Sequence, residues 1–301
     1  MPEGFITTGT NPNVLATIVA ALALPRLKAA TAMYAISDPS YGRDVAQYGQ
    51  SVNVPIPAEY SSNLLADGGT ITRQNPVLGN ATITLNRHRE ISFEITDLNE
   101  ALARPDLRQT NLGQALANMA QDIDSDLLSI YTQFTATAVG AYNTAITEAT
   151  VDSAETTLFN QRVPMGMRKS LVVSGNGYSQ IRQIPRFTED RMIREGAGPI
   201  ADGYVGRLKD LDVYRDQLVL VTSSTSTHGV ALAPPALLTA VRPLGATGNG
   251  MGVIQVELSE DNIGIRLTMS YHHEVLGTLM SIDVLYGYVA GRTAFGVEVK
   301  H

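Results

Sequence analysis

The sequence of 301 residues lacks cysteine and tryptophan, and aromatic residues make up only 6% of it. Without cysteine, the chain forms no disulfide, offers no thiolate ligand to a metal and has no cysteine nucleophile. This absence suits a protein of a reducing compartment. Lysine is also scarce, since only four occur, at Lys28, Lys169, Lys209 and Lys300.

Positive charge is in deficit as well. The 22 Lys and Arg residues are outnumbered by 29 Asp and Glu residues, which gives a net charge of −7 at pH 7. This balance argues against general nucleic-acid binding through phosphate contacts, although it permits a protein that surrounds nucleic acid without gripping it. A hydrophobic content of 44% and a charged content of 17% are typical of a folded chain with one large domain or two smaller ones.

Long hydrophobic runs are missing too. The most apolar run, Val14–Leu24, has eleven residues, whereas a membrane-spanning helix needs about 20. Residues 1–13 contain no basic side chain, which argues against a secretory signal. We instead expect an N-terminal helix that begins near Asn11, with Pro12 in its first turn, and ends before Pro25.

Alternation of apolar and polar residues predicts two strands in the first third of the chain. Residues 81–96 alternate over a length well beyond the roughly five or six residues of an average strand. Residues 51–58 alternate as well, but the two prolines among them cannot donate ladder hydrogen bonds, so one edge of this strand should be unpaired. The segment 59–80 is rich in glycine and polar residues. We therefore predict one extended hairpin over 51–96.

Residues 107–134 form the clearest predicted element, a helix roughly 40 Å long at 1.5 Å per residue. Apolar side chains recur at steps of three and four and form one stripe that includes Leu112, Leu116, Met119, Ile123, Leu127 and Ile130. Few compact domains need a helix of this length. A plate-like molecule with a stiff backbone does.

Shorter units follow from about residue 150 and predict a mixed α/β region with a strand-rich end. Ser153 is predicted to cap a helix over 154–161, and a short helix with proline in its first turn is predicted over 234–241. The Ser- and Thr-rich segment 223–229 is predicted to be a turn or loop. Further expected elements are a helix over 178–184 and strands over 168–174, 253–259, 264–272, 279–289 and 294–300.

The stretch NRHRE at 86–90 places charge in the middle of the long predicted strand. Arg87 and Arg89 share one face of that strand and His88 points to the other. No aromatic residue interleaves to stack nucleic-acid bases, so we interpret the stretch as an exposed ribbon whose charges pair with acidic groups on another surface. The residues predicted to make intermolecular contacts are Arg87, Arg89, Glu90, Leu64 and Leu65.

Three motifs imitate binding sites, but none is complete. Residues 122–126, DIDSD, begin like a calcium loop, yet Leu127 and Gln133 stand where that loop needs glycine and glutamate. We interpret this run as a solvated acidic face of the long helix. Residues 174–181, SGNGYSQI, carry Gln180 where a dinucleotide fingerprint needs a small residue, which favours a tight strand-to-helix turn.

The third motif is the adjacent pair His272 and His273 at the end of a predicted strand. Successive side chains of a strand point to opposite faces, so these two rings are poorly placed to chelate one metal ion. No serine elbow and no HExxH motif occur in the sequence. We therefore predict no catalytic, cofactor-binding or metal site.

The order of these parts resembles the major capsid (coat) proteins of tailed double-stranded DNA bacteriophages, whose α+β fold is named after phage Hong Kong 97. The resemblance covers nearly the whole chain and rests on order and spacing rather than on one specific motif. Residues 49–58 and 83–97 resemble the family's extended loop, and residues 107–134 resemble its spine helix. Residues 204–219 resemble part of its axial domain. Residues 228–244 with 267–299 resemble the usual ending of these proteins.

The resemblance implies a division of the chain into parts of the Hong Kong 97-like fold. These parts are an N-terminal arm with a helix over 1–48, the extended loop hairpin over 49–98, a peripheral domain with the spine helix over 99–148, an axial domain over 149–245, peripheral-domain strands over 246–290 and a C-terminal strand returning to the axial domain over 291–301.

The function implied by the resemblance is that of a non-enzymatic shell protein. Such a protein assembles with itself into pentamers and hexamers of an icosahedral capsid that encloses double-stranded DNA without sequence-specific binding. It needs no cofactor and no membrane, is assembled in the bacterial host cytoplasm and ends up in the virion capsid. Some members cross-link a lysine of the extended loop to an asparagine of a neighbour, but no lysine lies in 51–96, so that link is not expected.

The resemblance also implies two partner proteins, and two alternative functions stay open. Because the predicted hairpin begins near residue 50, no room is left for a scaffolding segment of the kind that precedes some members, which implies a separate scaffolding protein along with a portal. The first alternative is a bacterial nanocompartment shell protein of the same fold, an encapsulin, which encloses an enzyme. The second is a soluble α/β enzyme with an unrecognised site.

Overall fold

The computed structural model describes residues 32–41, 51–58, 60–65, 67–75, 78–102, 107–184, 204–219, 221–223, 226–245, 253–260 and 263–301. The helix predicted from Asn11 to Leu24 lies outside the described residues. None of the helices in the described part of the chain is both long and apolar enough to cross a membrane.

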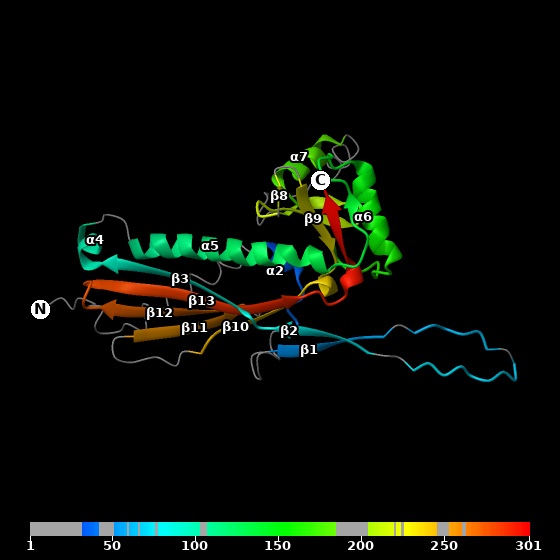
Figure 1. The fold of residues 1–301 in the computed structure, drawn as a ribbon, viewed down its shortest axis with the longest axis horizontal. Helices are drawn as coiled ribbons and strands as arrows, with labels where there is room; N and C mark the ends of the chain where they lie inside the picture. The colour runs from blue at the N-terminus through cyan, green and yellow to red at the C-terminus, as the bar shows by residue number, and fades with distance from the viewer. Residues whose placement is uncertain are drawn as a thin grey trace, which may run out of the picture.

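A five-stranded antiparallel sheet forms the elongated part of the molecule (Figure 1). Its longest strand, β13, pairs along one edge with β3, while its other edge pairs first with β12 and then with β10. β11 pairs with β12 and completes the sheet. The strands are β3 (Arg87–Thr96), β10 (Leu238–Arg242), β11 (Val253–Glu260), β12 (Ile263–His272) and β13 (Gly277–Val289).

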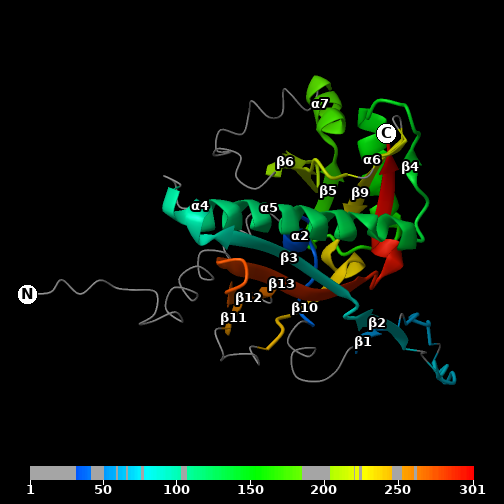
Figure 2. The same cartoon turned by 60° about the vertical axis from the view of Figure 1, so that its left-hand side comes forward.

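The predicted long helix is α5 (Leu107–Leu128), which runs along one face of this sheet (Figures 1 and 2). Its 22 residues span about 33 Å, and the last predicted turn is a 3₁₀ helix, η1 (Ser129–Gln133). The apolar stripe is confirmed as the buried face, since Leu112, Leu116, Met119, Ile123, Leu127 and Ile130 are all at most 7% exposed. Two short helices, α2 (Ala32–Ile36) and α4 (Asp97–Leu102), complete this half.

A seven-stranded mixed sheet forms the second half, with strand order β4-β14-β9-β5-β7-β6 and β8 beside β9. β5 and β7 run parallel, as do β4 and β14, and the other pairs are antiparallel. The strands are β4 (Val139–Gly140), β5 (Lys169–Val173), β6 (Tyr204–Leu208), β7 (Leu211–Arg215), β8 (Val221–Ser223), β9 (Ser226–Leu232) and β14 (Gly296–Lys300), and the last two 3₁₀ helices are η2 (Pro234–Ala236) and η3 (Thr293–Phe295).

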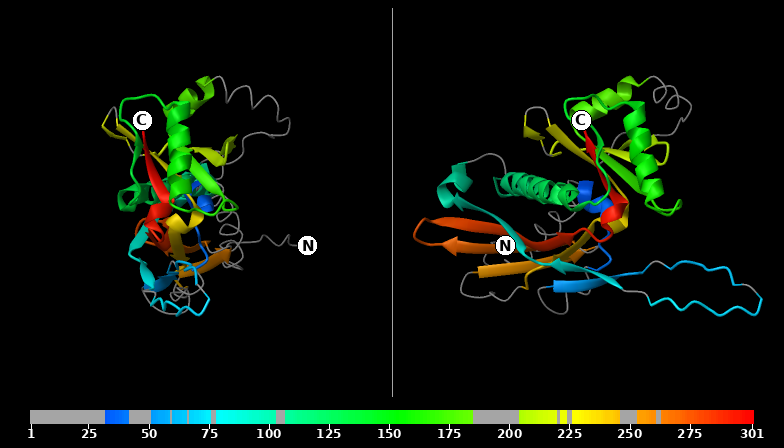
Figure 3. Two further views of the ribbon diagram at one scale, coloured as in Figure 1. Left: turned by 90° about the vertical axis from the view of Figure 1, so that its right-hand side faces the viewer. Right: turned by 45° about the vertical axis from the view of Figure 1, so that its right-hand side comes forward.

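Two helices pack beside this sheet, as Figure 3 shows: α6 (Glu148–Asn160) and α7 (Gly175–Gln183). α6 begins at Glu148, capped by Thr147, so the prediction that Ser153 caps it is wrong. Thr147 and Thr150 exchange hydrogen bonds and satisfy free N–H groups of the first turn. α7 begins directly after Ser174, whose hydroxyl accepts a hydrogen bond from Gly177 N at 3.1 Å.

Two further predictions are wrong because sheet partners override local composition. Most of 223–229, expected to be a loop, belongs to β9, which lies between β14 and β5. The helix expected over 234–241 is reduced to the three residues of η2, after which the chain continues as β10 against β13. The strands expected over 168–174 and in the last fifty residues are confirmed as β5, β11, β12, β13 and β14.

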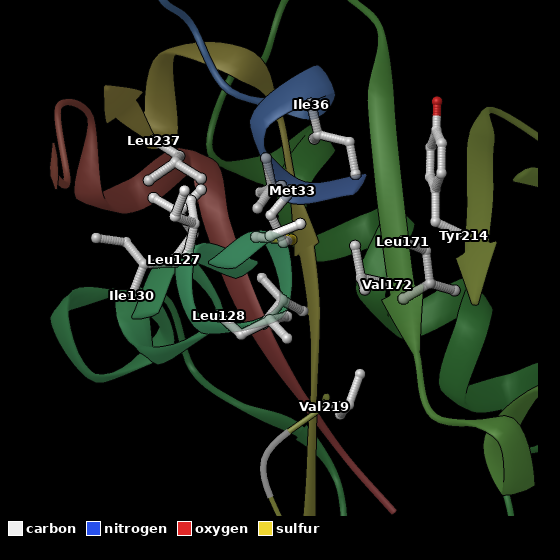
Figure 4. Close-up of a cluster of buried hydrophobic side chains, with 14 of the residues drawn as sticks. Met33, Ile36, Leu127, Leu128, Ile130, Leu171, Val172, Tyr214, Val219 and Leu237 are labelled. Carbon is white, nitrogen blue, oxygen red and sulfur yellow. The ribbon is translucent and has the colours of Figure 1, made fainter. Parts of the chain in front are cut away.

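The two halves share one hydrophobic core where α2 and the end of α5 meet the seven-stranded sheet (Figure 4). Met33 and Ile36 of α2 lie between the end of α5 and strand β5 in this view. The fully buried side chains of this junction include Met33, Leu127, Leu128, Ile130, Leu171 and Val172. The end of the long helix therefore packs in a core to which both sheets contribute.

Candidate functional site

The connection between β1 (Ser51–Ile56) and β2 (Gly79–Thr84) projects away from the body of the protein (Figures 1 and 3). We call its residues 57–78 the projecting loop. From Tyr60 onward every described residue of this loop is exposed. The large apolar side chains among them are 54% to 102% exposed and comprise Tyr60, Leu64, Leu65, Ile71 and Leu78. Single exposed apolar residues are ordinary, whereas five on one projecting segment make that segment a candidate contact surface.

Local contacts define the course of the projecting loop. The side chain of Gln74 bridges its two arms, because Oε1 accepts a hydrogen bond from Ser61 N at 3.1 Å and Nε2 donates to Ser61 O. At the tip, Gly68 has a φ of +75°, a left-handed conformation that glycine adopts without steric cost. The loop is thus presented as a ribbon with both arms side by side.

The base of the hairpin is anchored on the five-stranded sheet. β1 and β2 pair over six residues each, and their apolar side chains pack on β10 in a small core made of Val54, Ala81, Ile83, Leu85, Leu238 and Ala240. Gly287 of β13 permits this close approach, since a Cβ atom there would lie 2.2 Å from Thr84 O. The base of the hairpin is therefore packed on the sheet, whereas the described residues of the projecting loop from Tyr60 onward remain exposed.

Arg87 and Arg89 lie on β3 and bind Asp126 of α5 within the same chain. Arg87 Nη1 is 3.0 Å from Asp126 Oδ1, and Arg89 Nη2 is 3.0 Å from Asp126 Oδ2. Tyr286 OH donates to the same carboxylate, and Arg87 Nη2 donates to Tyr288 OH at 3.1 Å. This network ties β3 and β13 to the long helix.

Two of the donors in this network hold their protons more tightly than usual. Burial and the hydrogen bond to Asp126 raise the pKa of Tyr286, and the same carboxylate raises the pKa of Arg89 through its hydrogen bond. Tyr286 therefore stays a hydrogen-bond donor and Arg89 stays charged.

The prediction of one hairpin over 51–96 is thus wrong in its second half. Only β2 pairs with β1, whereas β3 pairs over its full length with β13. The arginines are not charges on a free ribbon, because their partner Asp126 belongs to the same subunit. Glu90 is exposed on the other face of β3, and Leu64 and Leu65 are exposed on the projecting loop. Their contact with another subunit stays a prediction, as does any further contact of the two arginines.

The double substitution Arg87→Glu with Arg89→Glu is expected to destabilise the isolated subunit by roughly 1–3 kcal/mol. It removes both cationic partners of Asp126, which keeps only the hydrogen bond from Tyr286, and it places two new carboxylates beside that side chain. Urea unfolding of the monomer measures this loss. The matched control, Glu90→Lys with Glu94→Lys, reverses two charges on the open face of the same strand and should change stability far less. Equal stability of both variants and the parent would show that the network contributes nothing to the subunit.

The other sequence motifs have structural explanations. The solvated acidic face expected at 122–126 is wrong in part, since Asp124 is only 3% exposed and accepts a hydrogen bond from Met33 N at 3.3 Å. The strand-to-helix turn at Ser174 is confirmed. His272 Nδ1 lies 3.4 Å from Glu94 Oε1. Among the described residues, no three His, Cys, Asp or Glu side chains gather so as to hold a metal ion.

A polar cluster on the seven-stranded sheet was not predicted from the sequence. His228 Nδ1 lies 2.5 Å from Glu298 Oε1, and Tyr142 OH donates to the same oxygen at 3.1 Å. The ring of Tyr131 stacks on His228 with centroids 4.5 Å apart. Burial and the nearby Glu298 raise the pKa of Tyr142. The one available signal was the pair of charged residues, Glu298 and Lys300, within an otherwise apolar strand.

No protein-family model matches the sequence, and no curated protein matches it at a significant level. Solved structures do match over most of the chain. The structure described as Mycobacterium phage Che8 is 14% identical, covers 89% of this chain and 90% of its own, and superposes with a TM-score of 0.65. The capsid of the native GTA particle is 11% identical, with 90% of each chain covered and a TM-score of 0.61.

A third match is the capsid structure of the cyanophage P-SCSP1u, which is 16% identical, covers 84% of this chain and 83% of its own and has a TM-score of 0.53. Identities this low speak for the fold and not for the activity. Because the alignments cover 84% to 90% of this chain, the likeness concerns most of its architecture. The chain therefore has the α+β fold of phage capsid proteins.

Proposed function

We propose that this chain is the major capsid protein of a tailed bacteriophage and that it assembles with itself into an icosahedral shell around double-stranded DNA. The observation that carries this proposal is the projecting loop with its five exposed apolar side chains. A two-stranded ribbon is marginal in water, so a second subunit has to cover it. The capsid fold of the whole chain supports the same conclusion.

Within this proposal the parts take the roles of a Hong Kong 97-like subunit. The projecting loop and its base, in 49–98, form the extended loop, and α5 forms the spine helix of a peripheral domain over 99–148 and 246–290. The seven-stranded sheet forms the axial domain, expected over 149–245, to which 291–301 returns. The expected bounds differ from the sheets at three strands, because β3 and β10 lie in the five-stranded sheet and β4 lies in the seven-stranded one. Residues 1–48, of which the structure describes 32–41, are assigned to the N-terminal arm. Head-to-tail contacts that close into rings would produce the pentamers and hexamers.

The partners proposed are further copies of this chain, a separate scaffolding protein and a portal. The net charge of −7 supports enclosure of DNA without tight binding, because phosphate neutralisation needs a basic surface. The subunit acts as a structural protein without catalysis, and its place is the virion capsid after assembly in the host cytoplasm.

The test is assembly of the purified protein, with its scaffold where one is needed. We expect closed icosahedral particles in electron micrographs and a fast-sedimenting species. Sedimentation that shows monomers alone under every assembly condition would overturn the proposal. Small shells that contain a cargo enzyme and no genome would instead identify a nanocompartment shell protein.

A further inference from the structure

The imidazole of His301, directly after β14, lies in a slot on the seven-stranded sheet. The residue is 7% exposed. Gly177 makes room for the ring, since a Cβ atom there would lie only 2.7 Å from its Nε2. Gly229 borders the slot at ordinary contact distance, because a Cβ atom there would lie 3.5 Å from Cε1 of the ring. Ile146 lines the slot as well, because its Cδ1 lies 2.9 Å from the same built Cβ of Gly177.

The slot joins three elements. The main chain of His301 exchanges two hydrogen bonds with Thr227, at 3.0 and 3.2 Å, which extend the ladder between β14 and β9. The side chain reaches across β9 to Ser174, where Nε2 lies 2.8 Å from Oγ. Ser174 is the cap of α7 and receives a hydrogen bond from Gly177 N. His301 thereby connects the end of β14 to the first turn of α7.

The hydrogen bonds of the slot fit a neutral ring. Ser174 Oγ can accept from Nε2–H as well as from Gly177 N, which leaves Nδ1 as a bare nitrogen. A second proton would place a positive charge on a residue that is only 7% exposed, which is costly because burial disfavours the charged form of the ring. The hydrogen bond between the ring and the main chain of Val299 favours the charged form and offsets only part of this cost.

The charged groups around the slot are occupied with other partners or only partly buried. Burial is the main cause that lowers the pKa of His301, the imidazole of His228 acts in the same direction, and the main chain of Val299 opposes them. On β14, Glu298 binds His228 and Lys300 lies 3.9 Å from Glu298. On α6, Asp152 pairs with Lys209, and Glu148 and Glu155 are partly buried. On α7, the guanidinium of Arg182 lies over the ring of Tyr178.

We propose that the slot is an acid-sensitive latch, in which neutral His301 holds β14 against the first turn of α7 and protonation of its ring releases that contact. The latch belongs to the isolated subunit and does not depend on shell assembly. Because the folded state binds the second proton less readily than the unfolded state, the contact is intact above the ordinary histidine range and is lost as the pH falls below it.

The experiment measures hydrogen exchange of α7 and β14 in the purified subunit at pH 7.5 and pH 5.5, corrected for the intrinsic pH dependence of exchange, with α5 as the internal reference. In the parent protein we expect roughly a tenfold loss of protection at the lower pH, in the direction that a lowered pKa of His301 requires. His301→Gln keeps an N–H group near Ser174 but cannot titrate, so its protection should not change with pH. His228→Gln should retain the pH step.

Gly177→Ala places a methyl group in the slot and should give the low protection of the acidic state already at pH 7.5. An NMR titration of the His301 ring in the parent protein provides a test that needs no variant, with a midpoint expected below 6.5, the ordinary value. A midpoint at or above that value, equal protection at both pH values, or an undiminished pH step in His301→Gln would overturn the latch.

Discussion

Replacement of Leu116 by aspartate is expected to abolish folding of the subunit. Leu116 is 1% exposed on the buried face of α5, in the core shared by the two sheets. The substitution removes an apolar side chain, which alone costs about 2–5 kcal/mol, and buries a carboxylate without a partner, which adds several kcal/mol more. Together these losses match the entire stability of an ordinary domain, about 5–15 kcal/mol.

The measurement is soluble yield together with thermal unfolding followed by circular dichroism. Gln121→Asp is the matched control, because it introduces the same side chain at an exposed position of the same helix and should leave a cooperative transition in place. A soluble Leu116→Asp protein with an unchanged melting temperature would mean that this face of α5 is not core.

Elements with a strong local period were the ones that could be predicted from sequence. The stripe on α5 and the alternation in β12 and β13 repeat over at least ten residues, and such patterns specify both the type of element and its buried face. The fold class followed from the order of these elements.

The errors arose where partners distant in sequence decide the outcome. Residues 223–229 look like a turn by composition, but 226–229 belong to β9 because β5 and β14 supply hydrogen bonds on both sides of that strand. The break between β2 and β3 cannot be seen in the alternation, which continues through it, and only the pairing of β3 with β13 reveals it. Arg87 and Arg89 find Asp126 at separations of 39 and 37 residues, for which no local signal exists.

The predicted contact residues also differ in whether the local sequence was enough to place them. Leu64 and Leu65 were predicted as contact residues from a loop without a partner strand, and both are exposed there. The arginines were assigned to the same surface on charge alone, yet they support the subunit itself. The exposure of Leu64 and Leu65 is compatible with a contact surface, but their contact with a neighbouring subunit stays a prediction.

The double substitution Leu64→Asp with Leu65→Asp is expected to leave the monomer intact and to prevent shell formation. Neither residue is buried in the isolated subunit, so the melting temperature of the monomer should not change. In an assembled shell each leucine covered by a neighbour would contribute about 1.5–3 kcal/mol, and a loss of 1.4 kcal/mol per contact already lowers association about tenfold. Particle yield should therefore fall by at least that factor, as counted by sedimentation and electron microscopy.

Thr70→Asp with Thr72→Asp is the control that separates lost apolar contact from added charge. Both threonines are exposed on the same loop, and this variant introduces the same two carboxylates without removing an apolar side chain. If both variants fail to assemble, charge repulsion between neighbouring loops explains the result, and the leucines have no special role. If the leucine variant forms normal shells, the projecting loop does not dock through these side chains. If its monomer unfolds, the loop packs on its own subunit. Only loss of shells in the leucine variant, with shells retained in the threonine variant and both monomers stable, supports a neighbour that covers Leu64 and Leu65.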